Sequence, residues 1–202
     1  MLTCTKPELV ATRPLIQVGE GRAFPLDNFG PADIYINDIA RSLSRKVRFS
    51  GLTVLPYTVS QHSVRGSLAE GIDIDLQKWM LFHDAAETYT GDISGVAKHW
   101  FGGDRLYHLD RWLTYAIAKR FGLSWPVPKD IKFLDMALLL GEAKALFLGL
   151  NTEIWQPYYR IYEEVKDGRP DPIFPPIVLD SMSDDTCCSE FLDRFHELFG
   201  RG

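Results

Sequence analysis

His83 and Asp84 stand side by side within a segment rich in apolar residues. An aspartate buried among apolar side chains without a partner is costly. A metal ion would satisfy both groups, because imidazole nitrogen and carboxylate oxygen are common ligands of divalent metals. For a His-Asp pair alone, the alternative is a core histidine next to an aspartate in water.

Two further carboxylates follow the pair. Glu87 comes four residues after His83, one turn along the same face of the helix we expect here. Asp92 belongs to a Thr-Gly-Asp turn that we expect to bend back toward the helix end. No basic residue stands between Lys78 and Lys98. Acidic groups crowded without basic partners bind a cation or have raised pKa values, so this segment predicts a metal site or an acid-base pair.

Two residues elsewhere extend this candidate site. His62 stands at the start of the preceding predicted helix, in VSQHSVRGSLAE. Asp135 interrupts an apolar helix face in IKFLDMALLLGEAKAL. A lone aspartate in such a face is either buried with a partner or faces a cavity. Glu142 lies seven residues further on, two turns along the same face, where it either supports the pocket or is partly solvated.

The remaining sequence predicts an all-α fold, because strand-like alternation is almost absent. Residues 1–32 are rich in Pro and Gly and predict an extended entry segment. Residues 33–150 predict the helical core, and residues 151–202 a C-terminal extension with a Pro-rich loop and a terminal helix packed on the core. We expect a bundle of six or seven helices, including ones near residues 33–45, 58–69, 73–90, 103–121, 128–150 and 184–199.

Composition and charge exclude several classes of function. The 202 residues carry a net charge of −5 and no basic block, which argues against a nucleic-acid track or an anionic membrane surface as partner. Three cysteines in a chain of this length do not indicate a disulfide framework. The start of the chain lacks the pattern of a signal peptide, and its longest apolar stretch is too short and too charged to span a membrane. We therefore expect a cytoplasmic protein.

The order of the candidate residues resembles that of the HD-domain metal-dependent phosphohydrolases. His62, the pair His83–Asp84 and Asp135 follow the family's order of His, His-Asp and Asp. VSQHS resembles the family's (E/Q)HS helix. HDAAETYTGDISGVAK resembles the HDxxExxTGDxxxPxK stretch of the 5′-deoxynucleotidase branch and its phage-type dNTP phosphohydrolase relatives, with Val96 where that branch often has proline. The resemblance covers the predicted helical core and implies its HD-domain fold.

This resemblance implies a role for each matched residue. One divalent cation (Mn, Co, Fe, Ni, Zn or Mg) would be bound by His62, His83, Asp84 and Asp135. Glu87 and Asp92 match the positions that orient or deprotonate the attacking water and protonate the leaving oxygen.

Phosphate needs cationic partners, and the segment RSLSRKVRFSG supplies them just upstream of the first histidine. The family keeps an arginine in this region, and the RF(S/T)G-like context makes Arg48 the first choice and Arg45 the second. Lys98 matches the family's trailing lysine. For each of the two arginines, the alternative is a solvated basic group that stabilises a helix end. A base would need an aromatic partner, and the candidates, each of which could instead belong to the core, are Phe49, Trp79 and Tyr89.

The implied function is a metal-dependent phosphohydrolase acting on small nucleotides. Deoxynucleoside 5′-monophosphates are the first expected substrates and dNTPs the second, and the resemblance also suggests a homodimer. A two-metal phosphodiesterase of this fold would need additional histidines, and the available His99 and His108 lie in no matching motif. A non-catalytic nucleotide-binding scaffold is the alternative from another class, although it would not require both Glu87 and Asp92.

Overall fold

The predicted all-α class is confirmed by the computed structural model, which describes residues 13–98, 100, 103–177 and 182–200. Its helices are α1 (Ile36–Leu43), α2 (Val59–Ser67), α3 (Ile74–Phe82), α4 (Glu87–Thr90), α5 (Gly95–Ala97), α6 (Gly103–Phe121), α7 (Asp130–Leu146), α8 (Thr152–Lys166) and α9 (Asp184–Phe199). The other elements are the strands β1 (Leu15–Gln17) and β2 (Ala23–Pro25) and the 3-10 turns η1 (Gly19–Gly21), η2 (Pro31–Asp33) and η3 (Phe49–Gly51). Seven of the described α-helices have eight residues or more.

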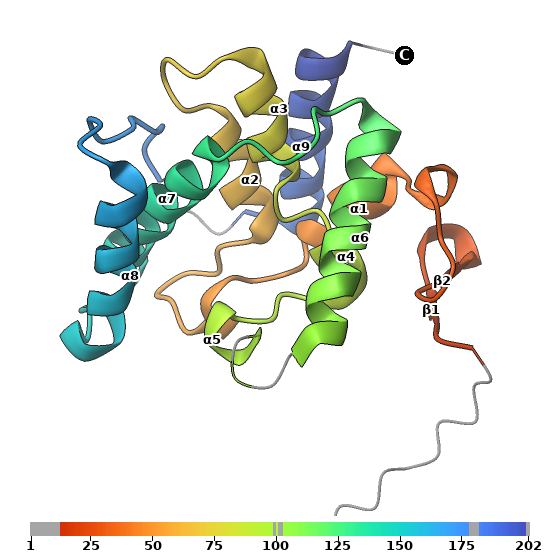
Figure 1. Cartoon of the computed structure of the whole chain (residues 1–202), viewed down its shortest axis with the longest axis horizontal. Coiled ribbons are helices and arrows are strands. Elements are labelled where there is room, and N and C mark those ends of the chain that lie inside the picture. The colour runs from red at the N-terminus through yellow and green to blue at the C-terminus, as the bar shows by residue number, and fades with distance from the viewer. Residues whose placement is uncertain (1–12, 99, 101–102, 178–181, 201–202) are drawn as a thin grey trace, which may run out of the picture.

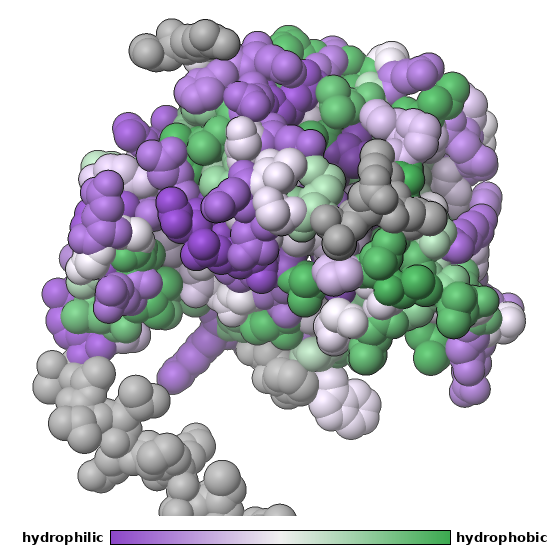
Figure 2. Space-filling view, turned by 180° about the vertical axis from the view of Figure 1, so that it is seen from behind, coloured by the Kyte–Doolittle hydropathy of each residue, from purple (hydrophilic) through white to green (hydrophobic). Residues whose placement is uncertain are grey.

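The helices extend from α7 and α8, which pack together at one end of the molecule, to a small hairpin at the other (Figure 1). Seen from behind, hydrophilic side chains predominate on the hairpin side and a hydrophobic patch lies low on the opposite side (Figure 2). Residues 1–12 of the predicted entry segment lie outside the described part of the chain. Among the described residues, no helix is long and apolar enough to cross a membrane.

The described part of the entry segment contains an antiparallel hairpin that the sequence does not predict. Strands β1 and β2 pair with Leu15 opposite Pro25. Each strand has only three residues, too few to show the alternation that marks a strand in a sequence. The hairpin turn contacts α1, where the Gly19 amide donates to Asp38 at 3.1 Å.

Short polar side chains begin several helices, as their positions predict. Thr58 forms a capping box with Gln61 at the start of α2, and Asp73 accepts a hydrogen bond from an amide in the first turn of α3. Asp33, where the helix near residues 33–45 was expected to begin, does not cap α1, which begins at Ile36. Asp33 ends the 3-10 turn η2 and accepts instead from the Gly30 amide at 2.9 Å.

Helix α8 lies in a region where the sequence predicts no helix. It is capped by Asn151 and contains Pro157 in its interior, a residue that normally ends or kinks a helix. Packing against α7 compensates for this local cost, since the rings of Phe133 and Tyr162 stack with centroids 5.8 Å apart. Tertiary contacts therefore stabilise a helix that local propensity disfavours.

The centre of the fold is formed by α3, which contacts α2, α7 and α9. Phe82, at the end of α3, is buried against aromatic rings of α9, among them Phe191 at 6.2 Å between centroids. Ser60 of α2 donates to the carbonyl of Cys187 in α9 at 2.8 Å. The end of α3 is thus held between helices, and the His-Asp pair follows it directly.

Candidate metal centre

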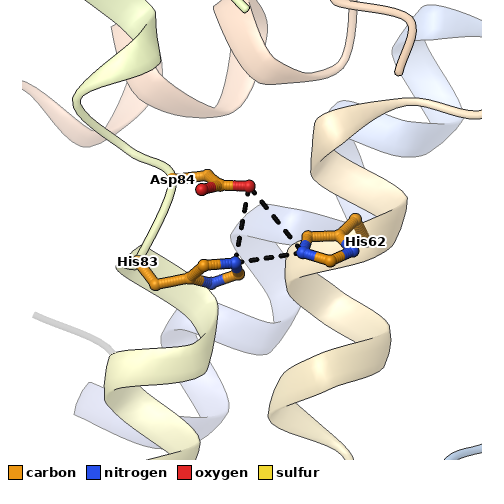
Figure 3. A group of neighbouring side chains, drawn as sticks. All are labelled: His62, His83 and Asp84. Atoms are coloured by element: carbon orange, nitrogen blue, oxygen red, sulfur yellow. Dashed lines mark hydrogen bonds and ion pairs between the residues drawn. The ribbon is translucent and has the colours of Figure 1, made fainter. Parts of the chain in front are cut away.

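Three of the candidate ligands converge between α2 and the end of α3. His62 lies on α2 with its side chain fully buried, and His83 and Asp84 follow α3 (Figure 3). One donor atom from each lies within 4.8 Å of the other two. Residues 21 positions apart in the chain therefore form a cluster that can hold a metal ion.

Asp135, the fourth predicted ligand, approaches the same atoms from α7. Its Oδ1 lies 3.4 Å from Nε2 of His62 and 3.7 Å from Nε2 of His83. The sequence left open whether this aspartate is buried with a partner or faces a cavity. In the structure it does both, since it contacts the two histidines and lines the neighbouring pocket.

A break in the helix allows two consecutive residues to face one site. The sequence predicts a helix continuing to residue 90, but α3 ends at Phe82 and residues 83–86 form a turn. The Glu87 amide donates to the Asp84 carbonyl, three residues back, at 3.0 Å. Adjacent residues of a regular helix point about 100° apart, whereas here both side chains reach the same atoms. Glu87 instead begins the separate helix α4.

In each imidazole, Nδ1, the nitrogen that points away from the cluster, lies next to a hydrogen-bond acceptor. Nδ1 of His62 lies 2.9 Å from the carboxylate of Glu142, and Nδ1 of His83 lies 2.7 Å from the carbonyl oxygen of Met80. Because a carbonyl oxygen can only accept, Nδ1 of His83 carries a proton. The buried carboxylate favours the same tautomer for His62. This arrangement of outer partners is typical of metal-binding histidines, because it turns the Nε2 lone pairs inward.

The distances between donor atoms fit a single ion. Ligands about 2.1 Å from an ion lie about 3.0 Å apart at a right angle and about 3.4 Å apart at the tetrahedral angle. The two Nε2 atoms are 3.0 Å apart, and Oδ2 of Asp84 lies 3.4 Å from Nε2 of His83 and 3.7 Å from that of His62. Two inward lone pairs at 3.0 Å repel one another unless a cation lies between them. His62, His83 and Asp84 therefore fit a metal ion, and Asp135 lies beside the two histidines.

The imidazoles and carboxylates of the cluster shift one another's pKa values. Burial acts to lower the pKa of His83, but the charges of Asp84 and Asp135 outweigh it and raise that pKa to about 9. Burial acts to raise the pKa values of both aspartates, but the two imidazoles lower them below the usual range. Without metal, His83 therefore holds a proton at neutral pH, and its positive charge offsets the charges of the two aspartates.

Glu142 supports the site from underneath and is fully buried. It accepts hydrogen bonds from Nδ1 of His62 and from the hydroxyl of Tyr57, both at 2.9 Å. Burial acts to raise the pKa of Glu142, but the neighbouring His62 and Arg48 lower it. Of the two roles left open by the sequence, the structure shows the supporting one.

Arg48 connects this support to the metal cluster. Its Nη1 lies 3.3 Å from Oδ2 of Asp84, and its Nε lies 3.3 Å from Oε2 of Glu142. The Nε contact is an ion pair without the direction of a hydrogen bond. Arg48 also lines the pocket next to the cluster, whereas the structure does not bring Arg45 there. The exposed side chain of Arg45 pairs with Asp184 of α9 at 3.4 Å.

A pocket of about 260 Å³ opens beside the cluster. Glu87 lies in its wall with Oε2 buried and without a hydrogen-bond partner among the described residues. Burial and the charges of Asp84 and Asp92 raise the pKa of Glu87 to about 8. Asp92 lies at the exposed rim, and partial desolvation raises its pKa as well. Lys98, whose Nζ lies 3.5 Å from Glu87, also lines the pocket.

Two curated proteins share sequence with this chain. It is 35% identical over 160 residues to uncharacterized protein RCAP_rcc00048 of Rhodobacter capsulatus, covering 76% of this chain and 79% of the relative. It is 31% identical over 133 residues to uncharacterized protein YfdR of Escherichia coli, covering 66% of this chain and 72% of YfdR. The chain belongs to the family of these two proteins. No protein-family model matches it.

In this member of the YfdR family, the unpredicted helix α8 contributes an aromatic wall to the pocket. Trp155 and Tyr158 both line it, with ring centroids 5.3 Å apart, and Phe49 faces them from η3. Local sequence contains no signal for this role, because α8 itself is not predicted. Of the other aromatic candidates, Trp79 and Tyr89 are buried in the core.

The remaining histidines considered for a two-metal site do not extend the cluster. His108 is exposed on α6, and His99 lies outside the described residues. The described part of the chain therefore offers one group that could hold a metal ion.

Proposed function

We propose that this protein is a divalent-metal-dependent phosphohydrolase that releases phosphate from nucleotides, with deoxynucleoside 5′-monophosphates as its first substrates. The observation that carries this proposal is the pair of inward Nε2 atoms of His62 and His83, 3.0 Å apart, next to a pocket with a protonatable carboxyl group. The resemblance to HD-domain phosphohydrolases supports it.

The donor set narrows the choice of metal. Two imidazoles and two carboxylates suit Mn, Co, Fe, Ni or Zn, accept Mg and suit Ca poorly. When bound, such an ion supplies a Lewis acid for the substrate phosphate and for a water molecule. His62, His83, Asp84 and Asp135 would hold it.

Glu87 and Asp92 are the groups we assign to proton transfer. The buried Glu87 carboxyl has a pKa of about 8 without metal. The charge of a bound cation would lower that pKa toward the neutral range, where general acid-base catalysis is efficient. Glu87 would orient the attacking water and accept its proton. Asp92, at the rim of the pocket, would protonate the leaving oxygen.

Positive charge in the pocket would bind the phosphate. Arg48 and Lys98 both line the pocket, and Lys132 joins them from α7. Arg48 is held on one side of the cluster by Asp84 and Glu142, so its guanidinium needs little reorganisation to meet a phosphate oxygen. Arg45 is a weaker candidate because its side chain turns toward α9.

Size and aromatic lining favour a mononucleotide. A volume of about 260 Å³ is near the lower limit of small-molecule sites, which favours a single phosphate over a triphosphate. Trp155 and Tyr158 offer faces on which a base can stack.

The test is a phosphate-release screen over dNMPs, NMPs, dNTPs and cyclic nucleotides with Mn²⁺, Co²⁺, Mg²⁺ or a chelator. We expect release from dNMPs that the chelator abolishes. Glu87→Gln should bind metal but lose at least 100-fold in turnover, whereas His83→Ala should lose both properties. His108→Ala, an exposed histidine on α6, is the matched control. Metal binding without phosphate release from any nucleotide would favour a non-catalytic scaffold and contradict the proposal.

A further inference from the structure

A second and larger pocket, of about 820 Å³, lies away from the metal centre. It is formed where the hairpin turn, the first turn of α1, the end of α6 and one face of α9 meet. None of the residues lining it lines the metal pocket. Its volume is within the range of small-molecule binding sites, and nothing in the proposed phosphohydrolase reaction uses it.

One wall of this second pocket is basic. Arg22, Arg41 and Arg120 line it together with Glu20 and Asp38. The charge of Asp38 is already matched, since its carboxylate accepts from Arg22 at 2.7 Å and from the Gly19 amide at 3.1 Å. The charge left over in the lining is therefore positive, although the chain as a whole carries −5.

Two of these arginines retain hydrogen-bonding capacity. Among the described residues, neither Arg41 nor Arg120 has a carboxylate within 4.0 Å. Nε of Arg120 donates to the carbonyl of Ile34 at 3.1 Å. This bond fixes the stem of the guanidinium and leaves its terminal nitrogens for an acceptor. A fixed guanidinium is well suited to bind a phosphate by two parallel hydrogen bonds.

The start of α1 forms another part of the lining. Ile36 and Asn37, the first two residues of this eight-residue helix, line the pocket. The N-cap Tyr35 has no side-chain hydrogen bond to the first turn, but the carboxylate of Asp38 lies in that turn and offsets the positive end of the helix dipole. Tyr35 is itself held by Arg22, whose guanidinium lies 3.8 Å from its ring centroid.

Another part of the lining is apolar. Phe121 from α6 and Leu192 and Phe195 from α9 line it, and the two phenylalanine rings are 5.6 Å apart. A simple inorganic anion would leave this wall in water. A ligand that joins an anionic group to a flat, weakly polar ring would contact both walls.

We propose that this pocket is a second binding site, for an organic phosphate with a planar ring, such as a nucleoside phosphate. Its phosphate lies between Arg41 and Arg120 next to the start of α1, and its ring packs on Phe121 and Phe195. The inference is independent of whether the metal pocket hydrolyses nucleotides.

Calorimetric titration of the full chain tests the site, with dAMP as the probe and inorganic phosphate and deoxyadenosine as its two halves. The protein is treated with a chelator so that metal-assisted binding at the other pocket is absent. We expect one dAMP to bind per chain, and each half to bind at least tenfold more weakly. Arg41→Gln combined with Arg120→Gln should weaken dAMP binding at least tenfold.

Arg105→Gln combined with Arg111→Gln is the matched control, because these exposed arginines of α6 lie outside the pocket and their loss changes the charge equally. Arg48→Gln reports on the metal pocket. Binding that survives Arg48→Gln and is lost with Arg41 and Arg120 supports the proposal. Loss with Arg48→Gln alone overturns it, as does the absence of any binding. The proposal would also be overturned if the Arg41→Gln, Arg120→Gln variant changed in oligomeric mass but not in dAMP affinity. The surface around this pocket would then bind a second copy of the chain.

Discussion

The Nε2 atoms of His62 and His83 lie 3.0 Å apart, and each ring is oriented by an acceptor at its other nitrogen. A carboxylate holds one ring and a backbone carbonyl the other. Two lone pairs so arranged are stable only around a proton or a metal ion. The need to orient the His62 ring explains why Glu142, a charged residue, is buried in the core of this fold.

Metal binding should depend on these two rings. We expect Mn²⁺ or Co²⁺ to raise the midpoint of thermal unfolding, because an ion that binds only the folded state stabilises it. At a concentration 100 times the dissociation constant, the gain is about 2.7 kcal/mol. His83→Ala should remove the shift, and His108→Ala should retain it. An unchanged shift in His83→Ala would place the ion elsewhere.

Glu142→Gln tests the support beneath His62. The amide keeps the size of the side chain but weakens its hold on the Nδ1 proton, so we expect metal affinity to fall about 10- to 100-fold. Tyr57→Phe removes only the hydroxyl that donates to Glu142 and should have a smaller effect. Equilibrium dialysis with Co²⁺ measures both, and equal affinity in Glu142→Gln would contradict the role.

Glu87 should make the stability of the metal-free protein depend on pH. Its folded pKa is about 8 against an ordinary value of 4.5, so between these values the folded state binds more protons than the unfolded chain. The free energy of unfolding should therefore fall as pH rises from 5 to 8, with a slope of at most about 1.4 kcal/mol per pH unit from this group.

Urea unfolding in chelator at pH 5, 6.5 and 8 measures this slope. Glu87→Gln should make it shallower, because the amide does not titrate, and the part above pH 6.5 that comes from the raised pKa of His83 should remain. Glu164→Gln, an exposed residue of α8, is the control and should leave the slope as in the wild type. A slope unaffected by Glu87→Gln would mean that other groups cause it.

Trp155→Ala should weaken substrate binding more than turnover. Loss of a ring stacked on a base costs about 1–3 kcal/mol, so we expect KM for a dNMP to rise about tenfold while kcat changes little. Trp155→Phe should recover most of the affinity. Tyr159→Ala, on the same helix but outside this pocket, should have little effect. A lower kcat with an unchanged KM would contradict the stacking role.

Two helical glycines should respond oppositely to alanine. A Cβ on Gly66 of α2 would lie 2.5 Å from Met80 and 3.1 Å from Leu138, whereas a Cβ on Gly141 of α7 meets nothing within 4 Å. Overpacking in Gly66→Ala should destabilise the protein by about 1 kcal/mol or more even after the gain in helix propensity. Gly141→Ala should stabilise it by about 0.5–1 kcal/mol. Urea unfolding of both variants checks the signs.

Local sequence was sufficient for most helices of the fold. Thr58 and Asp73 cap α2 and α3, and a glycine follows α6. These short-range signals placed the starts of α2 and α3 and the end of α6 within a few residues, whereas the predicted end of α3 at residue 90 was wrong. Helix α8 and the hairpin were missed, because an internal Pro157 and three-residue strands give no local signal. Their stability comes from contacts with α7 and α1.

The sequence alone determined which residue types would carry the chemistry, since histidines and carboxylates in an apolar context need a partner wherever they fold. Tertiary structure decided how they meet. The turn at residues 83–86 places His83 and Asp84 on one site, although a continuous helix would have separated them. The tertiary structure also places Arg48 in the pocket and Arg45 outside it, and it brings the aromatic side chains of α8 to the pocket wall. These outcomes depend on the packing of distant helices, which no local pattern encodes.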